Sequence, residues 1–243
     1  KGSEVEVIVQ VANFVQRKGG LWEPIRFGTA EQIVAEREKN VVFQMFIMSS
    51  LIAMGVYHLA FYFFRLKNKA LLAFGLVCMA IALRTAVLGE TILVRFFPDL
   101  SWEFVVKIEY WTSALGAGLF LLFGYYQYPK EINRKLTWTA FVLIVLYGLA
   151  VTFTEAKIYT YWMPYFSLFV GALFVYLISR FLLAIYHGRE GSKLHAIALV
   201  VLFASIVNDV LYYTHFIHTG EMVSIGLLFY LFVQAIILAS NFA

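Results

Sequence analysis

The sequence has few charged residues. Only 14% of its 243 residues are Asp, Glu, Lys or Arg, whereas about 25% is usual in soluble domains. Hydrophobic residues make up 62% of the chain, against about 45–50% in a soluble domain. Cysteine occurs once, as Cys78, so an intrachain disulfide scaffold is excluded. These shortages exclude an ordinary soluble enzyme and a disordered tail, and they favour a protein that lies in a lipid bilayer.

Several motifs of catalysis and cofactor binding are also missing. The sequence contains no GxxxxGK[ST] phosphate loop, no GxSxG nucleophile motif and no paired histidine motif for a metal. The net charge of +4 is mild and is not concentrated in a basic patch, so a nucleic-acid partner is not expected. We therefore expect no enzyme activity, no cofactor and no metal.

The charges that are present avoid seven long apolar runs. These runs contain five of the 34 charged residues in 155 residues. Each run is long enough to cross about 30 Å of hydrocarbon. Short connections force successive helices to run antiparallel. The sequence predicts an all-α membrane protein, a seven-transmembrane helix bundle with spans at 41–64, 70–88, 104–126, 136–154, 162–186, 194–217 and 222–242.

Lysine and arginine in the connections predict the orientation. The first, third and fifth connections carry eight of these residues, and the second, fourth and sixth carry two, Arg95 and Lys157. Cytoplasmic loops are enriched in positive charge. We therefore expect the N-terminus outside the cell and the C-terminus inside.

The first forty residues differ from the rest. Valines alternate with other residues from Val5 to Val11, and Gly19-Gly20 separates this run from a second short one. This pattern predicts a short β-hairpin. Two strands alone are marginally stable, so we expect residues 1–28 to be the remnant of an extracellular β-domain, in a chain that starts at Lys and is a fragment. Thr29 and Gln32 predict a capping box, which opens a polar linker helix at 29–40.

Ionisable groups inside the spans are the main functional candidates, because burying them in lipid is costly. With a helix rise of about 1.5 Å per residue, they reach similar depths in the outer third of the bilayer. Glu90 lies at the rim of the same region, and Tyr212 is one helical turn after Asn208. The candidates within the spans are Arg84, Lys107, Glu109, Asn208 and Asp209.

Three interpretations of this group remain open. In the first, Arg84 pairs with Glu109 or Asp209 and locks two helices together. In the second, the group is a site, open to the outside, for a small polar ligand or a proton. In the third, the helices face apart and each charged side chain reaches the membrane interface by itself. Gln234, at mid-depth in the last span, needs a hydrogen-bond partner and is a candidate for transmitting a signal.

Several segments together resemble a known family. They include Ala-Leu-Arg-Thr-Ala-Val-Leu-Gly-Glu at 82–90, Lys-Ile-Glu-Tyr at 107–110, which contains Tyr110, and Asn-Asp-Val-Leu-Tyr-Tyr at 208–213. With segments 54–69, 97–102 and 234–240, they resemble the bacterial seven-transmembrane receptors with diverse intracellular signalling modules. The resemblance covers all seven spans.

The resemblance implies a function. In that family, a jelly-roll domain that binds carbohydrate or another small ligand precedes the spans, and a kinase, cyclase or phosphatase module follows them. It implies that residues 1–28 end such a domain and that 41–243 form the membrane domain, in a bacterial inner membrane. Ligand identity, the output module and homodimer formation remain open.

The main alternative from another class is a small transporter or channel that uses the same polar group for a solute or a proton. An intramembrane enzyme ranks last, because no pair of nucleophile and base is evident.

Overall fold

The computed structural model describes residues 8–13, 15, 17, 25–213, 216–220 and 222–240. Within these residues the chain is helical and contains no strand. The predicted β-hairpin lies partly outside the described residues, and its described part, including 8–13 and 25–28, has no regular secondary structure. The helical content confirms the predicted all-α class.

Seven long helices occupy the positions of the seven predicted runs. Six of them are long and apolar enough to cross a membrane. The last, α8, has 18 residues and is the shortest of the seven, near the lower limit of about 17 residues for a span. The helices are α1 (Ala30–Phe61), α2 (Lys69–Val87), α4 (Trp102–Gln127), α5 (Arg134–Phe153), α6 (Ala156–Tyr186), α7 (Ser192–Tyr213) and α8 (Val223–Ser240).

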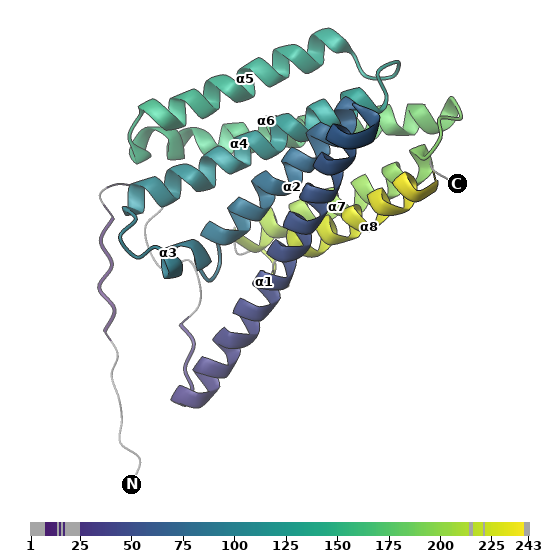
Figure 1. Cartoon of the computed structure of the whole chain (residues 1–243). Helices are drawn as coiled ribbons and strands as arrows, with labels where there is room; N and C mark the ends of the chain where they lie inside the picture. Colours follow the sequence, from purple (N-terminus) through teal and green to yellow (C-terminus); the bar gives the residue numbers. More distant parts are fainter. Residues whose placement is uncertain are drawn as a thin grey trace.

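The first helix is longer than the predicted span. Thr29 caps it, and the predicted capping box with Gln32 forms, because each side chain accepts the other residue's backbone N–H. No break separates residues 30–40 from the apolar part, so the expected linker helix and the first span are one helix. Its N-terminal part extends beyond the bundle (Figure 1). At its other end it passes into a π-helical turn, η1 (Tyr62–Leu66).

The connection between α2 and α4 contains a helix that the sequence did not predict. This short helix, α3 (Ile92–Phe96), lies at one end of the bundle, beside the end of α2 and near the start of α4 (Figure 1). Below, this end is called the α3 end. The opposite end contains the turns between α4 and α5 and between α6 and α7 and is called the Glu131 end.

Helix α2 is the most buried of the long helices and packs between α1 and α4. Two glycines let α1 and α2 approach closely: a Cβ on Gly75 would lie 3.1 Å from the carbonyl oxygen of Gly55. Helix α8 packs against α7, and α5 lies at the edge of the bundle beside α4 (Figure 1). Small residues at such contacts are typical of membrane helices.

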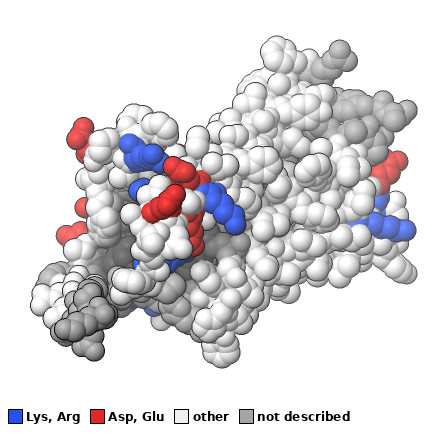
Figure 2. Space-filling view, turned by 90° about the horizontal axis from the view of Figure 1, so that it is seen from below, with Lys and Arg blue, Asp and Glu red and all other residues white. Residues whose placement is uncertain are grey.

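Charged side chains gather at the two ends of the molecule. Between them, the face seen in Figure 2 shows a broad band without charged residues. This distribution is expected when hydrocarbon surrounds the middle of the bundle.

Candidate functional site

The candidate residues of the α3 end form several separate contacts between helices. Arg84, in the last turn of α2, donates a hydrogen bond from Nη1 to the backbone carbonyl oxygen of Glu109 in α4, at 2.7 Å. The hydroxyl of Thr112 donates to the same carbonyl at 2.9 Å. The cation of α2 is thus held by the backbone of α4. Whether this contact acts as a lock or as part of a ligand site stays a prediction.

Two further candidates on α4 contact α5 and α6. Lys107 forms an ion pair with Glu103 at 3.1 Å and donates to the carbonyl oxygen of Thr152 at 3.3 Å. The ring of Tyr110 packs edge-on against Tyr159 of α6, with 5.0 Å between ring centroids. These contacts attach the start of α4 to its neighbours on the side away from α1.

Glu90 joins the turn after α2 to the extended part of α1. Its carboxylate accepts a hydrogen bond from Arg37 at 3.3 Å and one from Asn40 at 3.4 Å. Gln44 strengthens this junction: its amide donates to the carbonyl oxygens of Thr85 and Leu88 and accepts the backbone N–H of Glu90 at 3.0 Å. The sequence did not identify Gln44 as a candidate, because a single amide near the start of an apolar run does not indicate which residues it hydrogen-bonds.

Asn208 and Asp209 bind the turn between α7 and α8. The carboxylate of Asp209 accepts the backbone N–H of Met222 at 2.6 Å and that of Val223, the first residue of α8, at 3.1 Å. Asn208 donates to the carbonyl oxygen of Gly220 at 2.8 Å and accepts from the hydroxyl of Thr219 at 2.8 Å. A side chain of α7 therefore caps the start of α8, and the negative charge is favourable there.

Tyr212 lies one turn beyond Asn208, half-buried in the last turns of α7. The other candidates join helices toward the α3 end: α2 to α4, α1 to α2, α4 to α5 and α6, or α7 to α8. Depth alone did not predict these pairs, because it fixes height in the membrane but not rotation about the helix axis.

A second polar group lies near the Glu131 end, and it includes Gln234. The Nε2 atom of Gln234 is 2.7 Å from Nε2 of His195, and Nδ1 of His195 is 2.8 Å from the hydroxyl of Tyr128. His195 is fully buried and Gln234 is 6% exposed. A neutral imidazole has one donor and one acceptor nitrogen. If the amide donates, the ring donates to Tyr128, which in turn donates to the carbonyl oxygen of Glu190 at 3.3 Å.

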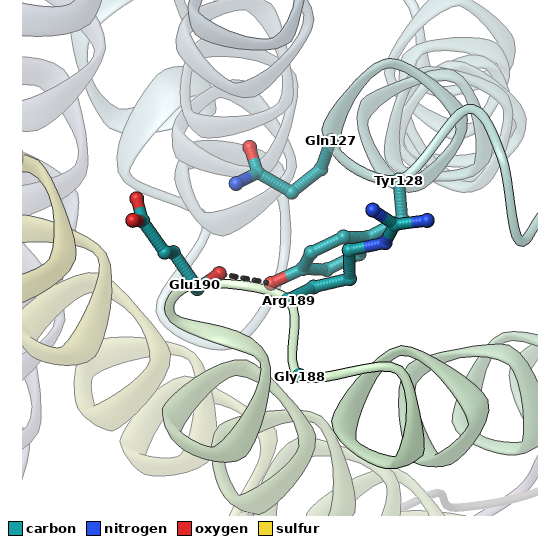
Figure 3. Close-up of a pocket in the computed structure, with 5 residues that line it drawn as sticks. All are labelled: Gln127, Tyr128, Gly188, Arg189 and Glu190. Atoms are coloured by element: carbon teal, nitrogen blue, oxygen red, sulfur yellow. Dashed lines mark hydrogen bonds between the residues drawn. The ribbon is translucent and has the colours of Figure 1, made fainter.

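This chain of hydrogen bonds joins α8 through α7 to the end of α4 and to the turn before α7. Figure 3 shows its outermost member, Tyr128, with its hydroxyl directed at Glu190. Both residues line a shallow pocket of about 390 Å³, together with Gln127, Gly188 and Arg189. His195 and Tyr128 were not among the sequence candidates, although a lone polar residue near the end of an apolar run is a usable signal.

Glu131 connects the two turns of this end. Its carboxylate is 4% exposed, forms an ion pair with Arg189 at 2.7 Å and lies 3.1 Å from Nδ1 of His187. The hydrogen bond from Arg189 and the contact with His187 hold the pKa of the Glu131 carboxyl below its usual range. The turn between α4 and α5 is therefore fixed to the turn between α6 and α7.

An apolar aromatic layer lies in the core of the bundle. Phe74, Phe120, Phe123 and Tyr230 come from α2, α4 and α8 and are buried. Their rings pack with centroid distances of 5.1 Å for Phe74 and Phe123 and 5.4 Å for Phe120 and Tyr230. Within the described residues, the ring packing joins apolar side chains of three helices in the middle of the bundle.

The described residues contain no group of three or more His, Cys, Asp or Glu that could hold a metal ion. Comparison with known protein families gives one match: the model of the family described as 7TM diverse intracellular signalling matches residues 40–241. No curated protein and no solved structure matches the chain. The matched range begins within α1 and includes the other long helices, from α2 to α8.

Proposed function

Because the chain belongs to the 7TM diverse intracellular signalling family, as its membrane domain, we propose that it couples a stimulus outside the cell to an output module in the cytoplasm. Residues 1–28 end an extracellular jelly-roll domain, 29–40 link it to the membrane, and 41–243 form the transducer. The N-terminus lies outside and the C-terminus inside, in a bacterial inner membrane. The net positive charge of the first, third and fifth connections supports this orientation.

The cap of α8 by Asp209 is the observation that carries the proposal. The two hydrogen bonds go from the residue before α8 and from its first residue to a side chain of α7. A shift of the end of α7 therefore changes the support of the start of α8. Helix α8 leads toward the C-terminus, where the family places its output modules, so movement of α8 is the signal that such a module receives.

The second polar group restricts this movement of α8. Gln234 is a buried amide in an apolar helix, and losing His195 as a partner would leave it unpaired at a cost of about 1–3 kcal/mol. Helix α8 thus resists small sliding and favours discrete arrangements. A ligand shifts the balance between such arrangements only by its different affinity for each.

The stimulus in this proposal is a small molecule or carbohydrate that acts through the extracellular domain or through the group around Arg84, Glu109 and Asp209. The output module is of the kinase, cyclase or phosphatase type, and two receptor copies pair in the membrane. No catalytic step is assigned to the chain itself.

The test is a fusion of the chain, with an extracellular domain, to a cyclase module after Ala243. Asp209→Ala removes the cap, whereas Asp99→Asn changes an exposed acid of a loop at the same end and is the matched control. We expect Asp209→Ala to change basal cyclase output several-fold at equal protein amounts, and Asp99→Asn to leave it unchanged.

Two results would contradict the proposal. One is an output that does not respond to Asp209→Ala or to Gln234→Leu. The other is solute flux in proteoliposomes that depends on Arg84 and Asp209, which would favour a transporter. The buried aromatic layer between the two polar groups supports the first function over the second, since transport needs a polar path across the bundle.

A further inference from the structure

Arg180 is a charged residue inside a membrane helix at the Glu131 end. It lies six residues before the end of α6, about 9 Å along the helix axis. Its guanidinium carbon lies 5.2 Å from the ring centroid of Tyr176, one turn earlier. Its Nε atom is buried without a hydrogen-bond partner. Among the ion pairs of the described residues, none includes Arg180, so its charge has no protein carboxylate to balance it there.

Two further cations lie close to this face of α6. The hydroxyl of Tyr176 accepts the backbone N–H of Asn133 at 2.9 Å, so the face of α6 that carries Tyr176 and Arg180 is turned toward the start of α5. That start is Arg134 and Lys135, which are both exposed. Three positively charged residues therefore lie at this end of α5 and α6.

The acidic residue nearest to Arg134 and Lys135 in the sequence, Glu131, is already paired with other residues. Glu131 lies two residues before Asn133, and both of its oxygens are bound by Arg189 and His187. Its charge is therefore directed to the turn before α7 and away from the three cations.

One side of α6 is exposed to lipid. Leu168, Val175 and Leu182, which recur every seven residues on one side of the helix, are 76%, 56% and 54% exposed. Residues seven apart lie on nearly the same face of a helix. This stripe lies on a different side of α6 from Arg180, because residues two apart, such as Arg180 and Leu182, do not share a helix face. It shows that hydrocarbon reaches this part of α6, and the charged start of α5 marks the level of the headgroups.

We propose that Arg180, Arg134 and Lys135 bind the phosphate of an anionic phospholipid between α5 and α6. An arginine at this depth is costly without a counterion, and the guanidinium and phosphate groups form strong charge-assisted hydrogen bonds. The lipid supplies the anion that the described residues do not, and its acyl chains extend into the surrounding bilayer. The site is independent of the proposed signalling function and of the orientation of the chain.

Trp138 provides a reporter for this lipid. It lies one turn after Arg134 on the same face of α5 and is 41% exposed. In the full chain, Phe replaces the other four tryptophans, which are Trp22, Trp102, Trp111 and Trp162. Trp138 is then the single source of tryptophan fluorescence. The protein is placed in phosphatidylcholine vesicles in which a small, equal fraction is either brominated phosphatidylglycerol or brominated phosphatidylcholine, with bromine close to the headgroup.

We expect the anionic brominated lipid to quench Trp138 more strongly, with an enrichment beside the helix of at least about fivefold over phosphatidylcholine, since each nearby cation favours an anionic lipid by about that factor. Arg180→Gln and the double change Arg134→Gln with Lys135→Gln should each reduce the enrichment, and Arg180→Lys should retain part of it. Lys157→Gln, at the other end of α6, is the matched control and should leave it unchanged.

Equal quenching by the two lipids, or an enrichment that Arg180→Gln does not reduce, would overturn the proposal. Added inorganic phosphate should not displace the lipid; if it abolished the difference in quenching, the site would bind a soluble anion instead. Should a variant fold poorly, extraction of the lipids that copurify with the folded fraction gives a second measurement, and Arg180→Lys should copurify more phosphatidylglycerol than Arg180→Gln.

Discussion

The amide of Gln234 in α8 lies 2.7 Å from the imidazole of His195 in α7. Both side chains are buried, so each supplies the partner that the other cannot obtain from water. In a bundle whose other contacts are largely apolar, this pair fixes the position of α8 along its neighbour. Loss of both members costs less than the sum of the two single losses, because each single change leaves a buried polar atom of the other residue unpaired.

Gln234→Leu should therefore destabilise the bundle by about 1–3 kcal/mol. His195→Leu should have a cost of similar size, and the double variant should cost clearly less than the two together. Reversible unfolding in mixed micelles measures these differences. Phe232→Leu, at a position of α8 that is 65% exposed, is the control and should have a small effect. Strictly additive costs would show that the two residues do not interact.

The ion pairs of Glu131 predict a dependence of stability on pH. The pKa of this carboxyl is lowered in the folded protein relative to its usual 4.5, first by the hydrogen bond from Arg189. The stabilising contribution is therefore complete above about pH 4.5, and it is lost as the pH falls through the lowered pKa. Wild-type protein should melt at a higher temperature than Glu131→Gln at neutral pH, and the two melting temperatures should converge in acid. A difference that persists unchanged at low pH would contradict this linkage.

The contact of α1 with α2 predicts a packing cost at Gly75. A Cβ there would lie 2.9 Å from Cγ of Leu59 and 3.1 Å from the carbonyl oxygen of Gly55. Gly75→Ala should destabilise the bundle by about 1–3 kcal/mol, because one neighbour is backbone and cannot rotate away. Gly171→Ala is the control, since a Cβ on Gly171 meets no atom within 4 Å. It should be neutral or slightly stabilising in the same unfolding measurement.

Asp209→Asn tests the cap of α8 without changing its shape. The amide oxygen can accept one backbone N–H, but the negative charge at the start of the helix is lost. We expect a loss of about 1 kcal/mol for Asn, with a larger loss for Asp209→Ala. Hydrogen exchange of the amides of Met222 and Val223 should speed up in both variants. Unchanged exchange at these two amides would show that the carboxylate does not protect them.

The proposed orientation predicts which loops react from outside the cell. In a Cys78→Ala background, a cysteine at Asp99 should react with a membrane-impermeant maleimide in intact cells. A cysteine at Lys130 should react only after the membrane is opened. Labelling of the Lys130 position in intact cells would reverse the assignment.

The sequence predicted the helices well because in a bilayer the apolar length of a segment decides its structure. It did not predict α3, since five residues between two spans carry no periodic signal. The polar helix that the capping box opens leads into the first span as one continuous helix, Ala30–Phe61. Composition thus determined what crosses the membrane, and local capping at Thr29 determined where the first helix starts.

The partners of the polar residues were harder to predict. The depth argument placed Arg84 and Asp209 at the same level, yet Arg84 contacts the backbone of Glu109 and Asp209 contacts the start of α8. A side chain's direction around the helix depends on packing that the sequence does not display. The contact of Glu131 with Arg189 joins residues 58 apart, and such long-range pairs appear only in the folded bundle.

The unbroken α1 has a mechanical consequence. Its 32 residues span about 48 Å, and Glu90 and Gln44 attach it to α2 partway along that length. A rigid rod held in this way acts as a lever: a tilt of about 5° about its far end moves its free tip by about 4 Å. Any domain attached to the start of α1 would therefore apply torque to α2 with little loss in bending, and small movements outside the bundle would reach its most buried helix.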